Sequence, residues 1–348
     1  MPYKVIQWGV GLNARRWCGR SPDTPTLSWW VPVCGAMQRT AVDAGALAGI
    51  GQLGVRATTD RQALIGTDAD VVISCPQARP DMSESDRDIT DLLRSGKNVI
   101  SVSGAHSMPA AIPGYSKQFE AACADGGSTF AAAGLNPNFI AERLGTTITG
   151  LCADVEAVTA EETYLCAEDS YALVFESVGF GRPLQEWGGI GSVVGAMFNH
   201  MFAQSVHNMA KTLDVELGDV TRTVDLVLAD RDIVLPAGVV KKDTVAAITQ
   251  TWCGIPKDPD QIRITVRVTW AVASDIAGHR LQSGWQVRVA GKPNLVMNMR
   301  VDPEEDRMYH HETMVGSAIA VVPEVMKADS GILLPKIFAP FKRRFLDA

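Results

Sequence analysis

Apolar and polar positions alternate in two different ways along the chain, and the change falls near residue 150. Before that point, short apolar runs are separated by segments with helical spacing. We predict strands at 3–8, 27–35, 68–75, 98–102 and 128–133, and helices at 84–96 and 113–126 that each end at glycine. Buried strands that alternate with helices are typical of a parallel sheet covered on both faces.

After residue 150 the alternating segments are longer, which is typical of an antiparallel sheet. We predict strands at 155–165, 222–234, 244–252, 261–273, 283–290 and 295–301, and helices at 189–213 and 312–327. The predicted fold is α/β: a Rossmann-type doubly wound parallel sheet plus a second α+β domain with a mostly antiparallel sheet. We expect a dinucleotide-binding domain at 1–140 and a substrate-binding and dimerisation domain at 141–305. Residues 306–348 are expected to form a C-terminal helix and tail that pack back on the first domain.

Composition narrows the class of protein further. The 348 residues are 46% hydrophobic, which is ample for about two domains with their own cores. With 32 basic and 39 acidic residues the net charge is −7, which argues against a nucleic-acid partner. No long apolar run or signal-peptide pattern is present, and the seven cysteines are scattered without a C-x-x-C motif. We therefore expect a soluble cytoplasmic protein with free thiols and without a membrane partner.

The strongest local motif directly follows the first predicted strand and opens a predicted helix. Gly9, Gly11 and Ala14 form the G-x-G-x-x-A pattern of dinucleotide-binding proteins. Gly9 permits the tight turn, Gly11 lets the backbone approach a diphosphate, and Ala14 lets helix and strand pack closely. Leu12 and Asn13 complete the cofactor-binding loop at the helix N-terminus. A purely structural glycine turn is the alternative interpretation.

The end of the second strand bears on the choice of cofactor. Binding of a free ribose 2′-hydroxyl normally uses an acidic residue there, yet residues 34–39 contain none. A neutral strand end followed by Arg39 favours a 2′-phosphate, so NADP(H) is preferred over NAD(H). Alternatively, Arg39 is an ordinary solvated side chain. Pro76, after the third strand, is a further cofactor-binding candidate.

Several segments, in order along nearly the whole chain, carry a family resemblance. They are 5–11, 43–49, 54–58, 92–101, 134–139, 175–183 and 283–289. The chain resembles the dihydrodipicolinate-reductase-like family that contains 2,4-diaminopentanoate dehydrogenase and the native amine dehydrogenases. The resemblance implies a Rossmann domain, a second α/β domain and hydride transfer between a nicotinamide and a C=N or C=O carbon. It also implies a homodimer.

One departure from that family lies after the fourth strand. Members that reductively aminate share an acidic pair there, in a pattern like N-V-V-S-T-C-E-E-L, and this chain has Gly104 and Ala105 instead. His106 follows at the edge where open α/β sheets bind ligands, and its usual pKa suits a general acid. The alternative is a loop histidine bonded to backbone. Ser103 is a candidate near the nicotinamide, and Ser107 is one near the substrate.

Further candidates follow the fifth strand. Asn136 is expected to contact the nicotinamide amide or the substrate. Asn138 stands where the family's N-P-G-F turn has glycine, and asparagine tolerates a left-handed backbone. Asn138 and the adjacent Phe139 are substrate-binding candidates.

The second domain supplies the remaining candidates. Tyr171 is a candidate proton donor, with packing as its alternative role. In the family that the chain resembles, this region helps form the substrate pocket, so the resemblance implies that Tyr164 and Phe175 line it. His200 and Gln204 share one helix face that lines the same pocket, or else forms a solvated or interface face. We expect no metal site, because no carboxylate or cysteine is spaced to complete a ligand set.

Together these features predict an NAD(P)H-dependent oxidoreductase. Its substrate is expected to be a hydrophobic ketone, aldehyde or imine, because no arginine or lysine cluster marks an anionic site. One alternative is an amine dehydrogenase whose acid has moved, with the candidates Glu161, Glu162, Glu168 and Asp169. Another is a non-catalytic dinucleotide-binding protein that kept only the scaffold.

Overall fold

The chain divides into two compact units, which are described separately below. Our computed structural model describes residues 3–9, 27–33, 41–49, 51–75, 81–103, 106, 113–187, 193–301, 309–334 and 336–342. The first unit contains residues 1–139 and 303–336, and the second contains residues 140–302 and 337–348.

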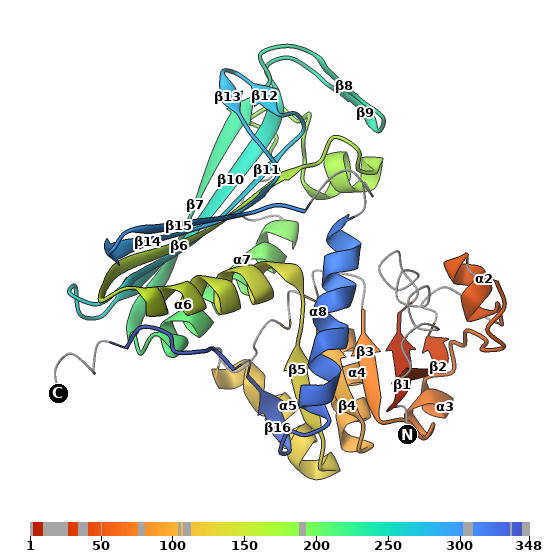
Figure 1. Cartoon of the computed structure of the whole chain (residues 1–348). Coiled ribbons are helices and arrows are strands. Elements are labelled where there is room, and N and C mark those ends of the chain that lie inside the picture. The colour runs from red at the N-terminus through yellow and green to blue at the C-terminus, as the bar shows by residue number, and fades with distance from the viewer. Residues whose placement is uncertain are drawn as a thin grey trace. The chain divides into compact units, whose positions relative to one another are not determined.

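The first unit is built on a parallel sheet of six strands in the order β16-β5-β4-β3-β1-β2 (Figure 1). Its strands are β1 (Tyr3–Trp8), β2 (Leu27–Val33), β3 (Val71–Ser74), β4 (Asn98–Ser101), β5 (Thr129–Ala132) and β16 (Gly331–Leu333). Its helices are α2 (Ala44–Ala48), α3 (Arg61–Ile65), α4 (Ser83–Arg94), α5 (Pro113–Gly126) and α8 (Tyr309–Val325). Pro32 is tolerated because β2 is an edge strand of the described sheet, with a register shift beside the proline.

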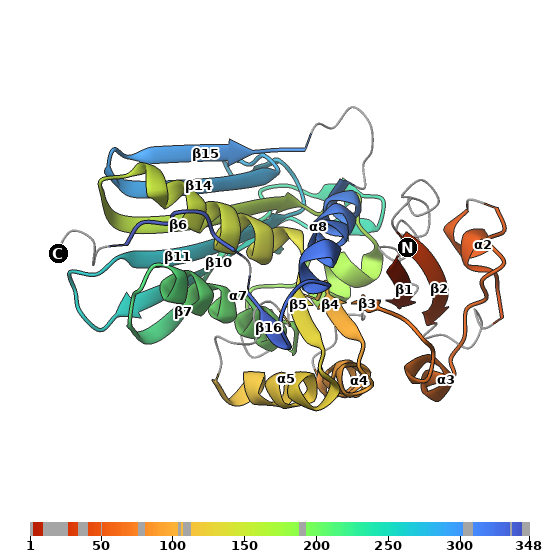
Figure 2. The same cartoon turned by 60° about the horizontal axis from the view of Figure 1, so that its bottom comes forward.

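Side chains of the parallel sheet alternate between two apolar cores, which is why helices cover both faces. Val5, Val71 and Ile73 pack with residues of α8 on one face. Ile6 and Val72 pack with α4 and α5 on the other. Figure 2 shows α8 on one side of this sheet and α4 and α5 on the opposite side. This doubly wound arrangement confirms the predicted fold class.

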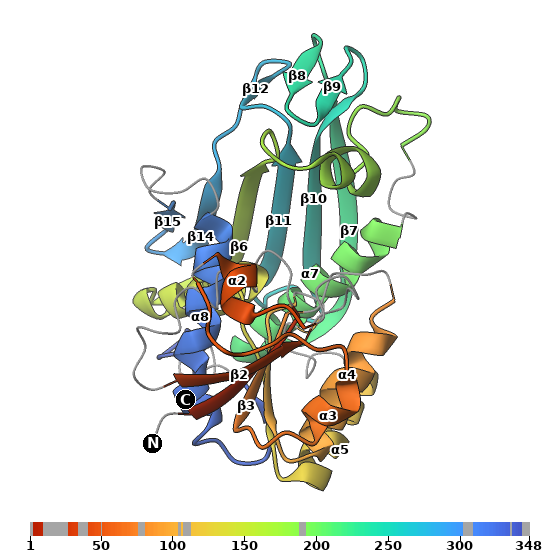
Figure 3. The same ribbon diagram turned by 90° about the vertical axis from the view of Figure 1, so that its right-hand side faces the viewer.

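The second unit contains a mixed sheet in the order β15-β14-β6-β11-β10-β7 (Figure 3). These strands are β6 (Asp154–Leu165), β7 (Leu217–Leu228), β10 (Val245–Pro256), β11 (Arg263–Ala271), β14 (Gly284–Lys292) and β15 (Leu295–Met299). Two small hairpins join β8 (Ile233–Leu235) to β9 (Gly238–Val240), and β12 (Asp275–Ile276) to β13 (His279–Arg280). All neighbouring strands of the large sheet are antiparallel except β6 and β11, which are parallel.

One long helix covers the apolar face of this sheet. Helix α7 (Val193–Thr212) packs on β7, β10 and β11, and it buries Phe202 against Trp252. Shorter helical segments are η5 (Leu135–Leu144), α6 (Gly145–Thr147), η6 (Ile148–Leu151) and η7 (Ala172–Ser177). The η5 segment crosses from the first unit to the second.

The described tail departs from the sequence-based expectation. Helix α8 packs on β4 and β5 of the first unit, but residues 337–342 belong to the second unit. There the amide of Phe341 donates to Thr149 Oγ1 at 3.0 Å, and Lys342 pairs with Asp214 at 3.0 Å.

Candidate functional site

The turn after β1 is the first candidate site in the first unit. Strand β1 lies between β2 and β3, so the strand order reverses there, and open α/β sheets bind ligands at such a point. Gly9 has a φ of 107°, and a Cβ on it would lie 2.4 Å from the carbonyl oxygen of Cys75. Only glycine fits this close approach. The remaining fingerprint residues Gly11, Leu12, Asn13 and Ala14, together with Arg39, Pro76 and Ser107, lie outside the described residues.

His106 lies after β4 and is completely buried. Its Nδ1 is 2.7 Å from Ser101 Oγ, and its Nε2 is 2.9 Å from Asp86 Oδ1. Ser101 Oγ accepts the amide hydrogen of Ser103 at 3.2 Å, so its own proton is available for Nδ1. With the ring proton on Nε2, Nδ1 accepts a hydrogen bond from Ser101 and Nε2 donates one to Asp86, so both contacts are satisfied.

The surroundings of His106 are aromatic. The rings of Phe119 and Phe130 lie 6.0 and 6.4 Å from the imidazole, both edge-on. Tyr115 donates to Asp86 Oδ1 at 2.9 Å, and burial together with the nearby carboxylate raises the pKa of Tyr115. The geometry therefore argues against the predicted general-acid role of His106, because both ring nitrogens are engaged and neither reaches solvent.

Asn136 and Asn138 lie after β5, at the start of η5. Asn136 is extended, with φ −132° and ψ 132°, and its peptide bond to Pro137 is cis. Asn138 is helical, so the turn does not need a left-handed backbone at this position. Its side chain is 3% exposed, and neither its amide oxygen nor its amide nitrogen has a hydrogen-bond partner. A buried amide without partners is costly, so Asn138 is suited to hold a polar ligand. Phe139 is half-buried beside it.

Tyr164 and Asp169 form a polar pair in the second unit. Tyr164 donates to Asp169 Oδ1 at 3.2 Å, while Asp169 Oδ2 is buried without a partner. Burial raises the pKa of Asp169, and the hydrogen bond from Tyr164 opposes that effect in part. The ring of Tyr164 packs edge-on against Trp270, with centroids 5.7 Å apart.

The other acidic candidates have different surroundings. Glu161 pairs with Arg267 at 2.9 Å, and Glu162 accepts a hydrogen bond from Trp285 Nε1 at 3.0 Å. Glu168 is exposed. Asp169 combines burial, a raised pKa and an oxygen that has no partner among the described residues.

The remaining candidates of the second unit occupy two places. Tyr171 is 57% exposed and stacks on Phe175 at 5.0 Å between centroids. On α7, Gln204 is fully buried and donates to the backbone oxygen of His200 at 3.2 Å. Within the described residues, no group of three His, Cys, Asp or Glu side chains is arranged to hold a metal ion.

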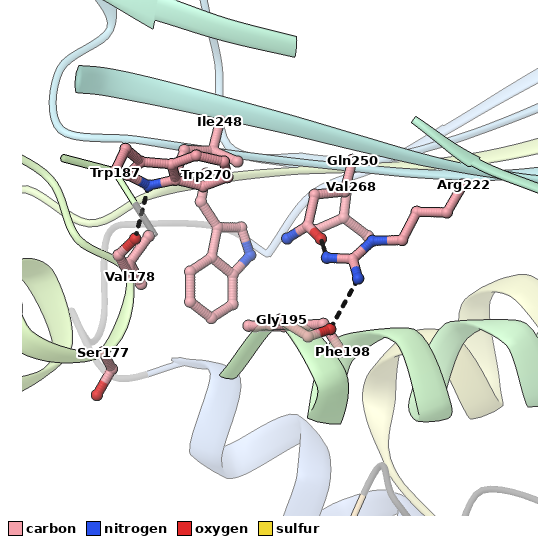
Figure 4. A pocket seen from close by; sticks show the side chains of 10 residues that line it. All are labelled: Ser177, Val178, Trp187, Gly195, Phe198, Arg222, Ile248, Gln250, Val268 and Trp270. Atoms are coloured by element: carbon pink, nitrogen blue, oxygen red, sulfur yellow. Dashed lines mark hydrogen bonds between the residues drawn. The ribbon is translucent and has the colours of Figure 1, made fainter. Parts of the chain in front are cut away.

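A pocket opens between the apolar face of the second sheet and the N-terminal part of α7 (Figure 4). Its enclosed volume is about 30 Å³, and the space becomes about 400 Å³ when the mouth that opens to solvent is included. Its lining residues are Ser177, Val178, Trp187, Gly195, Phe198, Arg222, Ile248, Gln250, Val268 and Trp270. Of these residues, the sequence indicates only Phe198, as one of several apolar side chains suited to line a cavity or to pack in a core.

The polar lining of this pocket did leave a signal in the sequence. Arg222 alternates in phase with Val220, Val224 and Leu226, so it is an arginine on the inward-facing side of its strand. Gln250 is likewise in phase with Ile248. Polar residues in the apolar phase of a strand indicate a lined cavity, although only the fold brings three strands together there.

Comparisons with known proteins agree with this architecture. Residues 139–338 match the family model described as 2,4-diaminopentanoate dehydrogenase C-terminal domain. An amine dehydrogenase from Streptomyces virginiae is 24% identical over 342 residues, which cover 94% of each protein. Among solved structures, amine dehydrogenase from Mycobacterium smegmatis matches with a TM-score of 0.79 at 16% identity over 97% of both chains. Biliverdin reductase from Synechocystis sp. PCC 6803, in complex with biliverdin and NADP+, matches with a TM-score of 0.53 at 12% identity, covering 94% of this chain and 92% of that one.

Fold and relatives together define an NAD(P)-dependent oxidoreductase. More particularly, the chain belongs to the 2,4-diaminopentanoate dehydrogenase family, whose model covers more than half of its length. The family resemblance found in the sequence is thereby confirmed. In the part of the chain that the structure describes, no helix is long and apolar enough to cross a membrane.

Proposed function

We propose that this protein transfers a hydride between NAD(P)H and the carbonyl or imine carbon of a hydrophobic ketone, aldehyde or imine. The observation that carries the proposal is the turn at Gly9, where the absence of a side chain lets the chain pass close to the Cys75 carbonyl at the reversal of strand order, which is the place where open α/β sheets bind their ligands. Gly11, Leu12, Asn13 and Ala14 would extend that turn, with Pro76 beside it. The nicotinamide, when bound, supplies the hydride.

The chain's own residues hold and orient the reactants. Ser103 and Asn136 lie at the ends of β4 and β5, where they would contact the nicotinamide end of the cofactor. The buried amide of Asn138 offers both a donor and an acceptor to a polar group. In the second unit, aromatic side chains would exclude water from the substrate. Tyr164, Phe175, His200, Gln204, Phe139 and Ser107 stay as substrate-binding candidates, and the exposed Tyr171 stays as a candidate proton donor.

NADP(H) is the proposed cofactor, because no acid follows the second strand and Arg39 lies close to its end. Titration with NADPH and NADH, followed by calorimetry, tests this preference. We expect Arg39→Ala to weaken NADPH binding roughly tenfold, as for loss of a charged hydrogen bond, and to leave NADH binding unchanged. Equal loss for both cofactors would contradict the assignment.

A second candidate function is reductive amination, with Asp169 as the relocated acid. Its support is the buried Oδ2 without a partner among the described residues, which leaves a place for an amine, and the raised pKa, since burial makes this carboxyl group hold its proton more tightly than a solvated one does. Tyr164 would hold the carboxyl group through its hydrogen bond to Oδ1.

Steady-state NADPH oxidation with a panel of apolar ketones, with and without ammonia, separates these candidates. Carbonyl reduction predicts turnover without ammonia. Amination predicts turnover only with ammonia, and a loss of about 100-fold in Asp169→Asn, as for removal of a general acid or base. Glu161→Gln is the matched control, because its partner Arg267 leaves it in an ordinary surface pair. Cofactor binding without turnover on any substrate would indicate a non-catalytic binding protein instead.

We also propose that the protein forms a homodimer and is located in the cytoplasm. Helices α6 and α7 run along one face of the second sheet (Figures 1 and 2). The opposite face carries threonines and paired charges, including Thr249 bonded to Thr269, and Arg267 with Glu161. This face is the proposed dimer surface. Sedimentation of the wild-type chain against Thr269→Arg tests it, and an unchanged mass in the variant would contradict this choice of surface.

A further inference from the structure

The pocket of the second unit is apolar in its walls but contains a buried indole N–H that has no acceptor among the described residues. Trp187, Phe198 and Trp270 provide aromatic surface (Figure 4). Trp187 Nε1 is satisfied, because it donates to the backbone oxygen of Val178 at 3.3 Å. Trp270 Nε1 is buried and has no partner. Indole nitrogen can only donate, so this position lacks an acceptor.

Gln250 provides a second donor in the same pocket. Its Oε1 accepts a hydrogen bond from Arg222 Nη2. A guanidinium has donors only, so this contact fixes the amide with its oxygen toward Arg222 and its nitrogen away from it. Figure 4 shows that nitrogen on the side of Gln250 that faces the indole of Trp270.

Arg222 adds positive charge beside Gln250 and Trp270. Its Nη1 donates to the backbone oxygen of Gly195 at 2.8 Å, and its guanidinium carbon lies 5.4 Å from the ring centre of Trp252. Its Nε is buried without a partner, and no described carboxylate forms an ion pair with it. Burial lowers the pKa of Arg222 from its ordinary value, yet arginine stays charged in proteins. An unneutralised cation beside a cavity favours an anionic ligand.

We propose that this pocket binds a small ligand whose apolar body ends in an acceptor oxygen, held between Trp270 Nε1 and Gln250 Nε2. Arg222 positions Gln250 and makes a carboxylate the preferred form of that oxygen. This binding site adds to the proposed function and depends on it for one point only, namely that the ligand bound in the pocket is the substrate. It revises the expectation of a wholly hydrophobic substrate, because the ligand then needs a polar group besides its reacting carbon.

Calorimetric titration of the full chain with benzoate, benzamide and toluene tests the inference. The three probes share one ring and differ only in the group attached to it. We expect benzoate to bind most tightly, benzamide next and toluene at least tenfold more weakly than benzoate, because only the first two offer an oxygen. Toluene binding as tightly as benzoate would overturn the proposal.

Two tryptophan variants sharpen the test. Trp270→Phe keeps an aromatic wall but removes the free donor, and we expect it to weaken benzoate binding about tenfold without changing toluene binding. Trp285→Phe is the matched control, because Trp285 lies outside the pocket and its N–H is already bonded to Glu162, and it should leave the preference for benzoate intact. Unchanged benzoate affinity in folded Trp270→Phe would contradict the donor site.

These titrations need no cofactor and no turnover. If the three probes bind in the predicted order of affinity but the chain transfers no hydride, the proposed function is wrong and the proposed binding site still holds. If the chain reduces ketones but shows no preference for benzoate, the proposed binding site is wrong and the proposed function still holds.

Discussion

At the residue scale, the buried polar side chains of this protein differ in whether their hydrogen bonds suit a structural or a chemical role. His106 and Asp169 both lie in apolar surroundings, but His106 has a partner on each ring nitrogen, whereas Asp169 has one satisfied oxygen and one free oxygen. A fully paired group stabilises the fold, while a half-paired group retains a site for a ligand or proton. The sequence marks both residues as candidates but cannot distinguish them, because it does not show which side chains become their partners. The partners of His106 lie 5 and 20 residues away along the chain, and the partner of Asp169 lies 5 residues away.

The pairing of His106 leads to a stability prediction. His106→Ala leaves Asp86 and Ser101 without a buried partner and opens a cavity, so unfolding of the first unit should become easier by roughly 2–4 kcal/mol. Tyr115→Phe removes one hydrogen bond to Asp86 and should cost about 1 kcal/mol. Urea unfolding monitored by hydrogen exchange in β4 measures both effects. Unchanged stability together with lost turnover would instead support the general-acid role.

The raised pKa of Asp169 leads to a prediction on pH. The folded chain binds the proton of Asp169 more tightly than the unfolded chain does, so this residue lowers stability as the pH rises above about 4. Asp169→Asn does not titrate and can still accept the hydrogen bond from Tyr164. The variant should therefore be more stable than the wild type at pH 7, by less than about 1 kcal/mol because solvent screens the partly exposed group.

Unfolding curves recorded between pH 4 and pH 8 check this expectation. The difference between Asp169→Asn and the wild type should shrink toward pH 4. A difference that grows as the pH falls would contradict the raised pKa.

At the scale of elements, regular segments were predictable and short ones were not. Gly96 ends α4 with a φ of 87°, as expected of a glycine after a helix. Strand β16 was missed, because its three residues become a strand only by pairing with β5. The parallel pairing of β6 with β11 was also hidden, since alternation along a strand is the same in either direction.

The close contact between α4 and α5 can be tested on one helix. A Cβ at Gly126 would lie 1.9 Å from the backbone oxygen of Leu93, so Gly126→Ala should destabilise the first unit by roughly 1–3 kcal/mol. Gly114, in the same helix, has nothing within 4 Å, and Gly114→Ala should be neutral or stabilise by about 0.5–1 kcal/mol. Thermal unfolding of both variants makes the comparison. Equal effects at the two positions would contradict the helix contact.

At the scale of the whole molecule, the two units share one chain that passes between them more than once. Residues 303–336 return to the first unit, and residues 337–342 then join the second. No local pattern predicts this, because α8 and the tail are adjacent in sequence and their destinations depend on which core accepts their apolar side chains.

The tail provides a test of that arrangement with a matched pair of residues. Phe341 is 7% exposed, and Phe338 is 84% exposed. Phe341→Ala should destabilise the second unit by roughly 3–5 kcal/mol, and Phe338→Ala should have little effect. Hydrogen exchange in α7 and β10 reports on the second unit directly. Protection lost equally in both variants would contradict the packing of the tail.

The sequence by itself determined the fold class, the order of the longer elements and the family, because each is visible in patterns of residues that are close together along the chain. The tertiary structure alone decided that His106 is enclosed, that Asp169 keeps an unpaired oxygen and that Arg222, Gln250 and Trp270 meet in one pocket. Those three pocket residues come from three neighbouring strands, and only the register between strands brings their side chains to the same place.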